Sequence, residues 1–320
     1  MVTEIVAVDV GGTHARFALA AVENGRVARL GGATTLKTSE YQSLDAAWAE
    51  FGRGLAAPLP RAAAIALAAP VTGEVLKLTN NDWVIRPARL PSALQVDRFT
   101  LVNDFGAVAH AVALLEPRHF THLCGPEVDL PAEGVITVVG PGTGLGVAHL
   151  LRRRGAAHVI ETEGGHIDFA PLDDTDDRIL HHLRATFGRV SVERIVSGSG
   201  LANIYAALHN QPPPQDEKAL WQAAMAGENP LAAAALDRFC LTLGAVAGDL
   251  ALAHGAHAVV IAGGLGQRLA EHLPRSGFPA RFTTKGRYAA RMAAMPVKII
   301  AYPQPGLFGA AAAFAAEHSG

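Results

Sequence analysis

Hydrophobic and polar positions alternate along the first third of the chain in short runs that are typical of β-strands. The expected elements are, in order, strands at residues 4–10, 15–22 and 26–36, a helix at 43–55, a buried strand at 61–70, and a strand leading into an Ala-rich helix over 99–115. The Asn24-Gly25 pair separates the second strand from the third and favours a tight hairpin. The chain is therefore expected to open with three strands and to continue with βα units.

The same order of elements returns in the middle of the chain. Residues 134–165 have the pattern of a strand, a glycine turn, a strand, an arginine-rich turn and a strand, so Gly142 takes the place that Gly11 has in the first set. The later expected elements are helices at 176–187, 192–208 and 217–253, an exposed loop at 211–216, a strand that starts at 258, and a final helix at 305–318. This order predicts an α/β protein built from two related halves.

Composition and charge narrow the class of protein. The chain has 320 residues, enough for two domains, and its hydrophobic fraction of 50% with 18% charged residues is typical of globular proteins with substantial cores. The net charge of −2 does not favour a nucleic-acid partner, and the basic cluster Arg152–Arg154 falls where a turn is expected. The cysteines, Cys124 and Cys240, form no CxxC pair, so neither a zinc site nor a disulfide framework is expected, and Cys240 is expected in the core.

No membrane partner is expected. The longest apolar run, residues 241–264, contains Asp249, His254 and His257, so no uninterrupted run reaches the ~18 residues of a membrane span. The first residues lack the basic segment and the small-residue cleavage site of a signal peptide. The sequence therefore predicts a cytoplasmic protein.

Three glycine-rich turns follow apolar strands, and they are candidate phosphate-binding segments. They are "VDVGGT" at 8–13, "VVGPGTGLG" at 138–146 and "VIAGGLG" at 260–266. Glycine lets backbone N–H groups approach and converge on an anion. A P-loop is excluded because no Gly-Lys-Ser/Thr occurs, and the dinucleotide pattern GxGxxG fails at Val147. Any one of these turns could be a plain hairpin, but folding alone does not require Asp9 inside a buried strand.

Six segments together resemble the bacterial glucokinase family, the hexokinase branch of the actin-like ATPase superfamily. They are "DVGGTHARFAL", "LVNDF", "GPGTGLG", "ETEGGH", "ERIVSGSGL" and "IAGGLG", in the family's order and spacing, and the likeness runs from about residue 5 to the C-terminal helix. The resemblance implies two α/β domains of the actin-like ATPase (ribonuclease H-like) type flanking a central cleft. The small N-terminal domain would comprise 1–110 plus 301–320, closed by the C-terminal helix, and the large domain 111–300.

The resemblance also implies an activity. It is the ATP-dependent phosphorylation of glucose to glucose 6-phosphate in glycolysis, by a homodimer, with glucose and ATP bound in the cleft and Mg²⁺ as the metal. Sugar binding is expected to close the cleft and exclude water.

The resemblance assigns the nucleotide site residue by residue. Asp9 would hold the Mg²⁺ of MgATP through water. The remaining residues are Gly11, Gly12, Thr13 and Arg16 on the phosphates, Gly142, Thr143 and Gly144 on the second phosphate turn, and Gly263 and Gly264 against the adenosine. Without a P-loop lysine, charge on the phosphates must be neutralised by the metal, the turn N–H groups and Arg16. The family usually has Asn where this chain has His14.

The sugar site is assigned in the same way. From the residues alone, Asp104 could be a helix N-cap. The resemblance makes Asp104 the general base that takes the proton of the sugar's 6-hydroxyl. The sugar ligands it implies are Asn103, Glu163, His166 and Glu193, and Asn81 in the loop "LTNNDW" is a further expected contact.

Alternatives for the acidic residues remain open. Glu161 lies two residues from Glu163 and could take its place, and Glu193 could be a first-turn acid of a helix capped by Ser191. A metal site at 161–168 is not favoured because the helical HExxH pattern is absent.

Two other functions fit the same fold. A related hexose kinase acting on mannose, fructose or an N-acetyl amino sugar commonly carries a cysteine-rich zinc motif after the "EGGH"-like segment, whereas residues 167–177 here contain no cysteine. A sugar-sensing regulator needs a DNA-binding segment, for which the phosphate turn at residue 9 leaves no room. Asp104 also favours catalysis.

Overall fold

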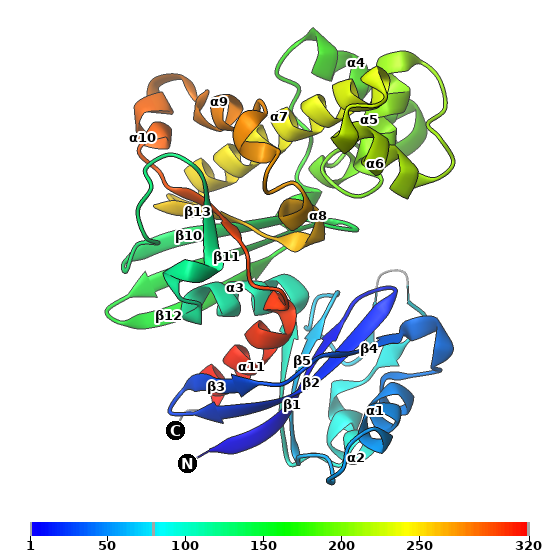
Figure 1. Ribbon diagram of the computed structural model, residues 1–320, viewed down its shortest axis with the longest axis vertical. Helices are drawn as coiled ribbons and strands as arrows, with labels where there is room; N and C mark the ends of the chain where they lie inside the picture. The colour runs from blue at the N-terminus through cyan, green and yellow to red at the C-terminus, as the bar shows by residue number, and fades with distance from the viewer. Residues whose placement is uncertain (1, 79–80, 319–320) are drawn as a thin grey trace. The chain divides into compact units, whose positions relative to one another are not determined.

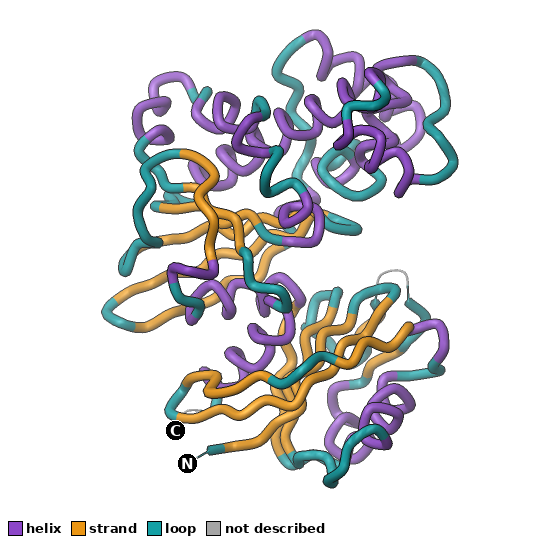
Figure 2. Tube along the Cα trace, in the orientation of Figure 1, coloured by secondary structure: helices purple, strands orange, loops and turns teal. Residues whose placement is uncertain are grey.

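The protein consists of two compact units, described here from a computed structural model that covers residues 2–78 and 81–318 (Figure 1). Unit 1 comprises residues 1–115 and 302–320, and unit 2 comprises residues 116–301. The sequence predicts the corresponding boundaries after residues 110 and 300. Figure 2 shows that each unit contains its own sheet, in orange, with helices in purple.

The sheet of unit 1 has the strand order β3-β2-β1-β5-β8, with β4 also paired to β2. Its strands are β1 (Thr3–Val10), β2 (His14–Glu23), β3 (Arg26–Leu30), β4 (Thr34–Lys37), β5 (Ala62–Leu67) and β8 (Arg98–Asn103), and a separate hairpin joins β6 (Leu76–Lys77) to β7 (Val84–Ile85). β1 is antiparallel to β2, while β1, β5 and β8 are parallel. Asn24 and Gly25 both have positive φ, which confirms the predicted tight hairpin.

The prediction of one continuous strand at residues 26–36 is wrong. The run 26–36 forms two strands, β3 and β4, which pair with different parts of β2. The break falls at Gly31-Gly32, where the Gly31 N–H donates to the Leu19 carbonyl outside the regular ladder. Glycine lacks the side chain that stabilises a strand interior, so the pairing is interrupted there.

Helices cover both faces of this sheet. They are α1 (Leu44–Arg53), α2 (Leu90–Leu94), α3 (Asp104–Leu114) and α11 (Pro305–Glu317). One face packs Phe17 of β2 against Trp48 and Phe51 of α1, and the other packs Ala-rich strands against Leu307 and Phe314 of α11. The close packing of α11 on α3 requires Gly309, because a Cβ there would overlap the Ala107 carbonyl.

The sheet of unit 2 repeats the same connectivity. Its order is β12-β11-β10-β13-β14-β9, with bounds β9 (Phe120–Cys124), β10 (Gly134–Pro141), β11 (Leu145–Arg153), β12 (Ala156–Thr162), β13 (Ala258–Ile261) and β14 (Val297–Ile300). β10, β11 and β12 are antiparallel, and β10, β13 and β14 are parallel, so the predicted repeat of a three-strand opening is confirmed. Arg154 and Gly155 have positive φ and form the expected arginine-rich turn. The strands β9 and β14 were not predicted.

The helices of unit 2 differ from the predicted ones at two places. Those that the structure describes are α4 (Asp174–Phe187), α5 (Gly200–His209), α6 (Glu217–Ala226), α7 (Pro230–Ala253), α8 (Gly263–Arg268), α9 (Phe278–Thr283) and α10 (Ala289–Ala293). The predicted helix 192–208 is wrong over its first half, which holds only the 3-10 turn η5 (Val192–Arg194) and a bend around Gly198. The predicted helix 217–253 is two helices, because Gly227 ends α6 in the left-handed region and Asn229 caps α7.

The long helix α7 is the central element of the unit 2 core. By length and composition it could cross a membrane, but 67% of its most apolar window is buried. Phe239, Cys240 and Leu243 are all fully buried, which confirms the core position expected for Cys240. The helix therefore packs as the core helix of unit 2.

Candidate active site

Asp9 lies on β1 directly opposite Arg16 of β2, one strand pair away from the turn of the hairpin. Its Oδ2 atom is 3.4 Å from Nη1 of Arg16, and the carboxylate side chain is 19% exposed. Burial raises the pKa of the Asp9 carboxyl, and the Arg16 guanidinium opposes that shift. A buried carboxylate with one cationic neighbour is a good acceptor for a second cation.

Gly306, on the first turn of α11, provides the space beside this carboxylate. A Cβ at position 306 would lie 2.7 Å from Asp9 Oδ2. Within residues 2–78 and 81–318 no cluster of three or more His, Cys, Asp or Glu side chains could hold a metal by itself. Mg²⁺ in nucleotide sites takes one or two carboxylates together with phosphates and water. Asp9 therefore fits a magnesium ion that a nucleotide brings with it.

The turn after β1 exposes backbone donors. Gly11 donates its N–H to the His14 carbonyl at 2.9 Å and closes the hairpin. Thr38 binds the turn from the other side, with its Oγ1 donating to the Gly12 carbonyl and its N–H donating to the Thr13 carbonyl. In the described part of the chain, the N–H groups of Gly12 and Thr13 have no hydrogen-bond partner. The phosphate contacts predicted for this turn thus depend on Gly12 and Thr13 more than on Gly11.

The second glycine turn, in unit 2, joins β10 to β11. The Gly142 N–H donates to the Gly144 carbonyl at 2.8 Å, and the Gly198 N–H donates to the Gly142 carbonyl at 2.7 Å. Thr143 at the tip of the turn is exposed. The turn is therefore closed by its own backbone and supported by the bend that follows η5.

The third glycine segment lies against the second. Gly263 has φ of +75° and begins α8, and a Cβ there would lie 2.5 Å from the Pro141 carbonyl at the end of β10. Gly264 has open space where a side chain would be. The structure thus brings two of the predicted nucleotide segments together, and it shows that the third segment is the first turn of a helix.

Asn103 and Asp104 mark the point where β8 becomes α3. Asn103 is the N-cap, since its Oδ1 accepts the N–H groups of Phe105 and Gly106 and its Nδ2 donates to the Ala69 carbonyl. The alternative in which Asp104 caps the helix is therefore wrong. Asp104 is the first residue of the helix, half-buried, and its Oδ1 accepts the adjacent Phe105 N–H at 2.9 Å. The sugar contact predicted for Asn103 stays a prediction.

Glu163 precedes the short 3-10 turn η4 (Gly164–His166), and His166 is the last residue of that turn. Both side chains are more than half exposed, and His166 Nε2 lies 4.0 Å from Glu163 Oε2. The turn packs on β11, because a Cβ at Gly165 would overlap the Leu145 carbonyl. The predicted sugar ligands therefore lie on the same strand end as the second glycine turn.

A residue that the sequence did not single out anchors this segment. Arg189 donates through Nη2 to the His166 carbonyl at 2.6 Å, and its Nε lies 2.7 Å from Asp168 Oδ1. The backbone of 167–169 also pairs with that of 190–192 through two hydrogen bonds. Arg189 therefore joins the η4 segment to the segment that leads into Glu193.

Glu193 contacts the second glycine turn directly. Its Oε2 accepts the Leu145 N–H at 2.9 Å, and a Cβ at Gly144 would overlap that oxygen. The alternative for Glu193 holds in part: Glu193 does lie in the first turn after the N-cap Ser191, but that turn is the single 3-10 turn η5 and Ser191 makes no side-chain capping bond. Glu161 lies on β12 opposite Ala148 and is exposed.

Asn81 is the remaining predicted sugar contact. Its Oδ1 accepts the Trp83 N–H at 2.8 Å, and its buried Nδ2 has no hydrogen-bond partner among the described residues. Residues 79–80 of the same loop lie outside the described residues. Asn81 thus retains an unused donor, which is compatible with the predicted contact.

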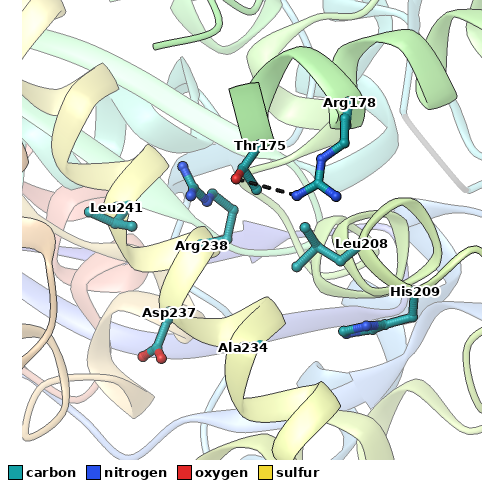
Figure 3. A pocket seen from close by; sticks show the side chains of 8 residues that line it. All are labelled: Thr175, Arg178, Leu208, His209, Ala234, Asp237, Arg238 and Leu241. Atoms are coloured by element: carbon teal, nitrogen blue, oxygen red, sulfur yellow. Dashed lines mark hydrogen bonds between the residues drawn. The ribbon is translucent and has the colours of Figure 1, made fainter. Parts of the chain in front are cut away.

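A pocket on the helical side of unit 2 is distinct from these residues. It has a volume of about 410 Å³ and lies among α4, α5 and α7, where Figure 3 shows Arg178 reaching toward Thr175 with His209 and Asp237 at its edge. Its lining residues, all in the described chain, include none of the predicted site residues. The predicted site is instead built from strand ends and turns.

Comparison with known proteins identifies the family. The sequence model of the family described as "Glucokinase" matches residues 6–317. The glucokinase of Zymomonas mobilis is 62% identical over 320 residues, covering 99% of each chain. Among solved structures, a glucokinase from an Antarctic psychrotroph has a TM-score of 0.81 and 32% identity, over 97% of this chain and 98% of that one.

A more distant structure shows the same fold. The ROK family glucokinase from Streptomyces griseus, in complex with glucose and AMPPNP, has a TM-score of 0.64 at 19% identity and covers 96% of this chain and 98% of that one. The predicted fold class, actin-like ATPase domains of α/β type, is confirmed by these structural matches and by the repeated sheet topology. The full-length match in sequence carries the functional class as well: the chain is an enzyme and belongs to the glucokinase family.

Proposed function

We propose that this chain transfers the γ-phosphoryl group of ATP to the 6-hydroxyl of glucose and releases glucose 6-phosphate and ADP. The observation that carries the proposal is the 62% identity to the Zymomonas mobilis glucokinase along 99% of both chains. The glucose and AMPPNP in the Streptomyces griseus structure support glucose as acceptor and ATP as donor.

In this proposal Asp104 is the general base. Phosphoryl transfer requires a nucleophile that is oriented and relieved of its proton as it attacks the γ-phosphorus in line. The Asp104 carboxylate accepts the proton of the glucose 6-hydroxyl, and the new O–P bond replaces the bond to the leaving ADP oxygen. The position is compatible with this role, because Asp104 is the first residue of α3, directly after the N-cap Asn103, and is only half-buried.

The phosphates are bound by the glycine turns. Gly12 and Thr13 present N–H groups that are not used elsewhere in the described chain, and Arg16 adds a cation. Gly142, Thr143 and Gly144 form the second turn, and Gly263 and Gly264 are the proposed adenosine contacts: Gly264 has open space beside it, while Gly263 lets α8 approach the end of β10. Asp9 would hold Mg²⁺, and when bound this ion neutralises charge on the phosphate oxygens.

The sugar is recognised by hydroxyl acceptors and donors. Glu163, His166 and Glu193 of unit 2 and Asn81 and Asn103 of unit 1 are the proposed ligands. Carboxylates positioned for hydroxyl groups reject molecules that lack those hydroxyls, because the polar groups are then left unpaired. We further propose that the enzyme acts in glycolysis as a cytoplasmic homodimer.

The proposal is tested by following ADP release with MgATP and a panel of glucose, mannose, fructose and N-acetylglucosamine. We expect glucose to give the highest kcat/KM, and phosphorus NMR to show the phosphate on carbon 6. A higher kcat/KM for another hexose would keep the mechanism and change the substrate. Binding of glucose without turnover of any sugar would contradict catalysis and favour a sugar sensor.

A further inference from the structure

Glu193 connects the two parts of the unit 2 site that are assigned to different substrates. Its Oε2 accepts the Leu145 N–H at 2.9 Å, at the end of the phosphate turn, and the absence of a side chain at Gly144 makes this contact possible. A carboxylate has two oxygens and about four acceptor positions, so Glu193 can accept a sugar hydroxyl while it keeps the Leu145 bond.

The segment that carries Glu193 holds the phosphate turn at its other end too. The Gly198 N–H donates to the Gly142 carbonyl at 2.7 Å, and the Gly198 carbonyl accepts the indole N–H of Trp221 on α6 at 2.9 Å. The turn is thus fixed at both ends by residues 193–198. A shift of Glu193 is transmitted to the turn without passing through any other element.

The charge of Glu193 predicts how this contact affects the affinity of the turn for ATP. An ionised carboxylate beside a phosphate-binding turn repels the phosphates of ATP. A glucose hydroxyl that donates to the same carboxylate offsets part of its charge, which lowers the repulsion. We propose that Glu193 couples the two substrates, so that glucose bound at Glu193 strengthens the binding of ATP at the turn Gly142–Gly144. This inference rests on the proposed function and adds to it a positioning role for a sugar ligand.

Four variants separate the contact from its surroundings. Glu193→Gln removes the charge and keeps an acceptor for Leu145, while Gly144→Ala keeps the charge and displaces the flexible end of Glu193. Gly142→Ala adds the same methyl group to the same turn at a position with nothing within 4 Å. Glu161→Gln makes the same carboxylate-to-amide change on the neighbouring strand β12.

The measurement is the Kd of glucose by titration calorimetry, with and without saturating Mg²⁺ and AMPPNP. By linkage, the ratio of these two constants equals the effect of glucose on the affinity for the nucleotide. In the wild type we expect AMPPNP to tighten glucose binding about fivefold or more. We expect the ratio to fall to less than half its wild-type value in Glu193→Gln and in Gly144→Ala, and to be retained in Gly142→Ala and Glu161→Gln. Glu193→Gln should also bind AMPPNP more tightly than the wild type when glucose is absent.

The two failures are distinguishable. A wild type that binds both ligands with a ratio near one, or a ratio unchanged in Glu193→Gln and Gly144→Ala, overturns the coupling and leaves the glucose kinase reaction intact. Loss of the ratio in Gly142→Ala to the same extent as in Gly144→Ala also overturns it, because the effect would then belong to the turn and not to Glu193. A wild type that neither binds nor phosphorylates glucose overturns the proposed function itself.

Discussion

The hairpin β1–β2 of unit 1 and the hairpin β10–β11 of unit 2 have the same ladder but carry different chemistry. Counting strand pairs from the turn, the second pair is Asp9 with Arg16 in unit 1 and Gly140 with Gly146 in unit 2. Unit 1 therefore has its carboxylate on the strand itself. In unit 2 the carboxylate beside the turn comes from Glu193, on a separate segment.

At the fifth pair from the turn, it is unit 2 that has the polar side chains and unit 1 that has apolar ones. The pair is Val6 with Leu19 in unit 1, and in unit 2 it is Thr137 with His149, whose side chains lie 3.1 Å apart between Oγ1 and Nδ1. One backbone plan therefore accepts a charged pair near the turn in one unit and a buried polar pair away from it in the other. Function on a repeated fold is set by a few side chains, while the ladder supplies only their positions.

Within this comparison of the two hairpins, the largest expected effect comes from the Asp9 carboxylate, which the second hairpin lacks on its strand. Asp9→Asn keeps the size of the side chain and removes its charge, so we expect kcat/KM for MgATP to fall about 10²-fold or more. Steady-state kinetics with thermal unfolding as a control measure this. A change of less than tenfold in a folded variant would show that the charged pair is not what distinguishes the two hairpins.

A smaller effect is expected when the carboxylate is moved but not removed. Gly306→Ala places a methyl group 2.7 Å from Asp9 Oδ2, so the carboxylate must shift. We expect the KM for MgATP to rise about tenfold with glucose binding nearly unchanged. The matched control is Gly32→Ala, in the same unit with nothing within 4 Å of its Cβ. Equal kinetics for the two variants would contradict a role for the space beside Asp9.

The anchoring of Glu193's segment in unit 2 gives a third test. Arg189→Ala removes the guanidinium that joins the His166 carbonyl to Asp168, and we expect the KM for glucose to rise about fivefold with a smaller change in kcat. Arg189→Lys should restore part of the affinity. Arg61→Ala breaks an equally exposed pair with Asp97 in unit 1 and serves as the control. A glucose KM that responds alike to both alanine variants would argue against positioning by Arg189.

The smallest expected effect concerns the fifth pair, where His149 changes the free energy of unfolding only below neutral pH. Burial, and to a lesser degree the ring of His254 at 3.8 Å, lowers the pKa of His149 to about 4 from an ordinary 6.5. As the pH falls, His149 therefore binds a proton near pH 6.5 in the unfolded chain but only near pH 4 in the folded protein. Stability is full above pH 6.5 and falls as the pH drops from 6.5 toward 4, by about 2 kcal/mol between pH 7 and pH 5 from this group.

His149→Leu places at this position the residue type that its counterpart in unit 1, Leu19, has. We expect the free energy of unfolding of this variant, measured by denaturant titration, to depend less on pH between 7 and 5 than that of the wild type. His110 on α3, whose pKa burial also lowers to about 4, contributes equally to both proteins. An unchanged pH dependence would show that His149 does not titrate with folding.

Much of the fold behind this comparison could be predicted from the sequence, because the residue patterns that indicate it are local. The Asn24-Gly25 pair and the Arg154-Gly155 pair each predict a hairpin turn, and the strand that runs into Asp104 predicts the start of α3. The repeated glycine turns indicate the two halves. Each of these signals lies within a few residues of the structure that it predicts.

The features that the sequence did not reveal depend on contacts between distant residues. Gly306 touches Asp9, and Glu193 touches Leu145, only because the chain folds back. The strand β14 has four residues, one of them the buried Lys298, so its apolar run is too short to identify. Gly227 ends one expected helix in the left-handed region, and in the other the Gly198 N–H bonds the distant Gly142 carbonyl instead of a helical one; apolar periodicity indicates neither.

The central claim is that Asp104 is the base in glucose phosphorylation. The most direct test compares the wild type with Asp104→Asn, measuring the Kd of glucose by calorimetry and kcat by ADP release in the presence of MgATP. We predict a glucose Kd within about threefold of the wild type and a kcat lower by about 10²–10⁴-fold, because only proton transfer is lost. A kcat within tenfold of the wild type, with glucose still bound, would contradict the account.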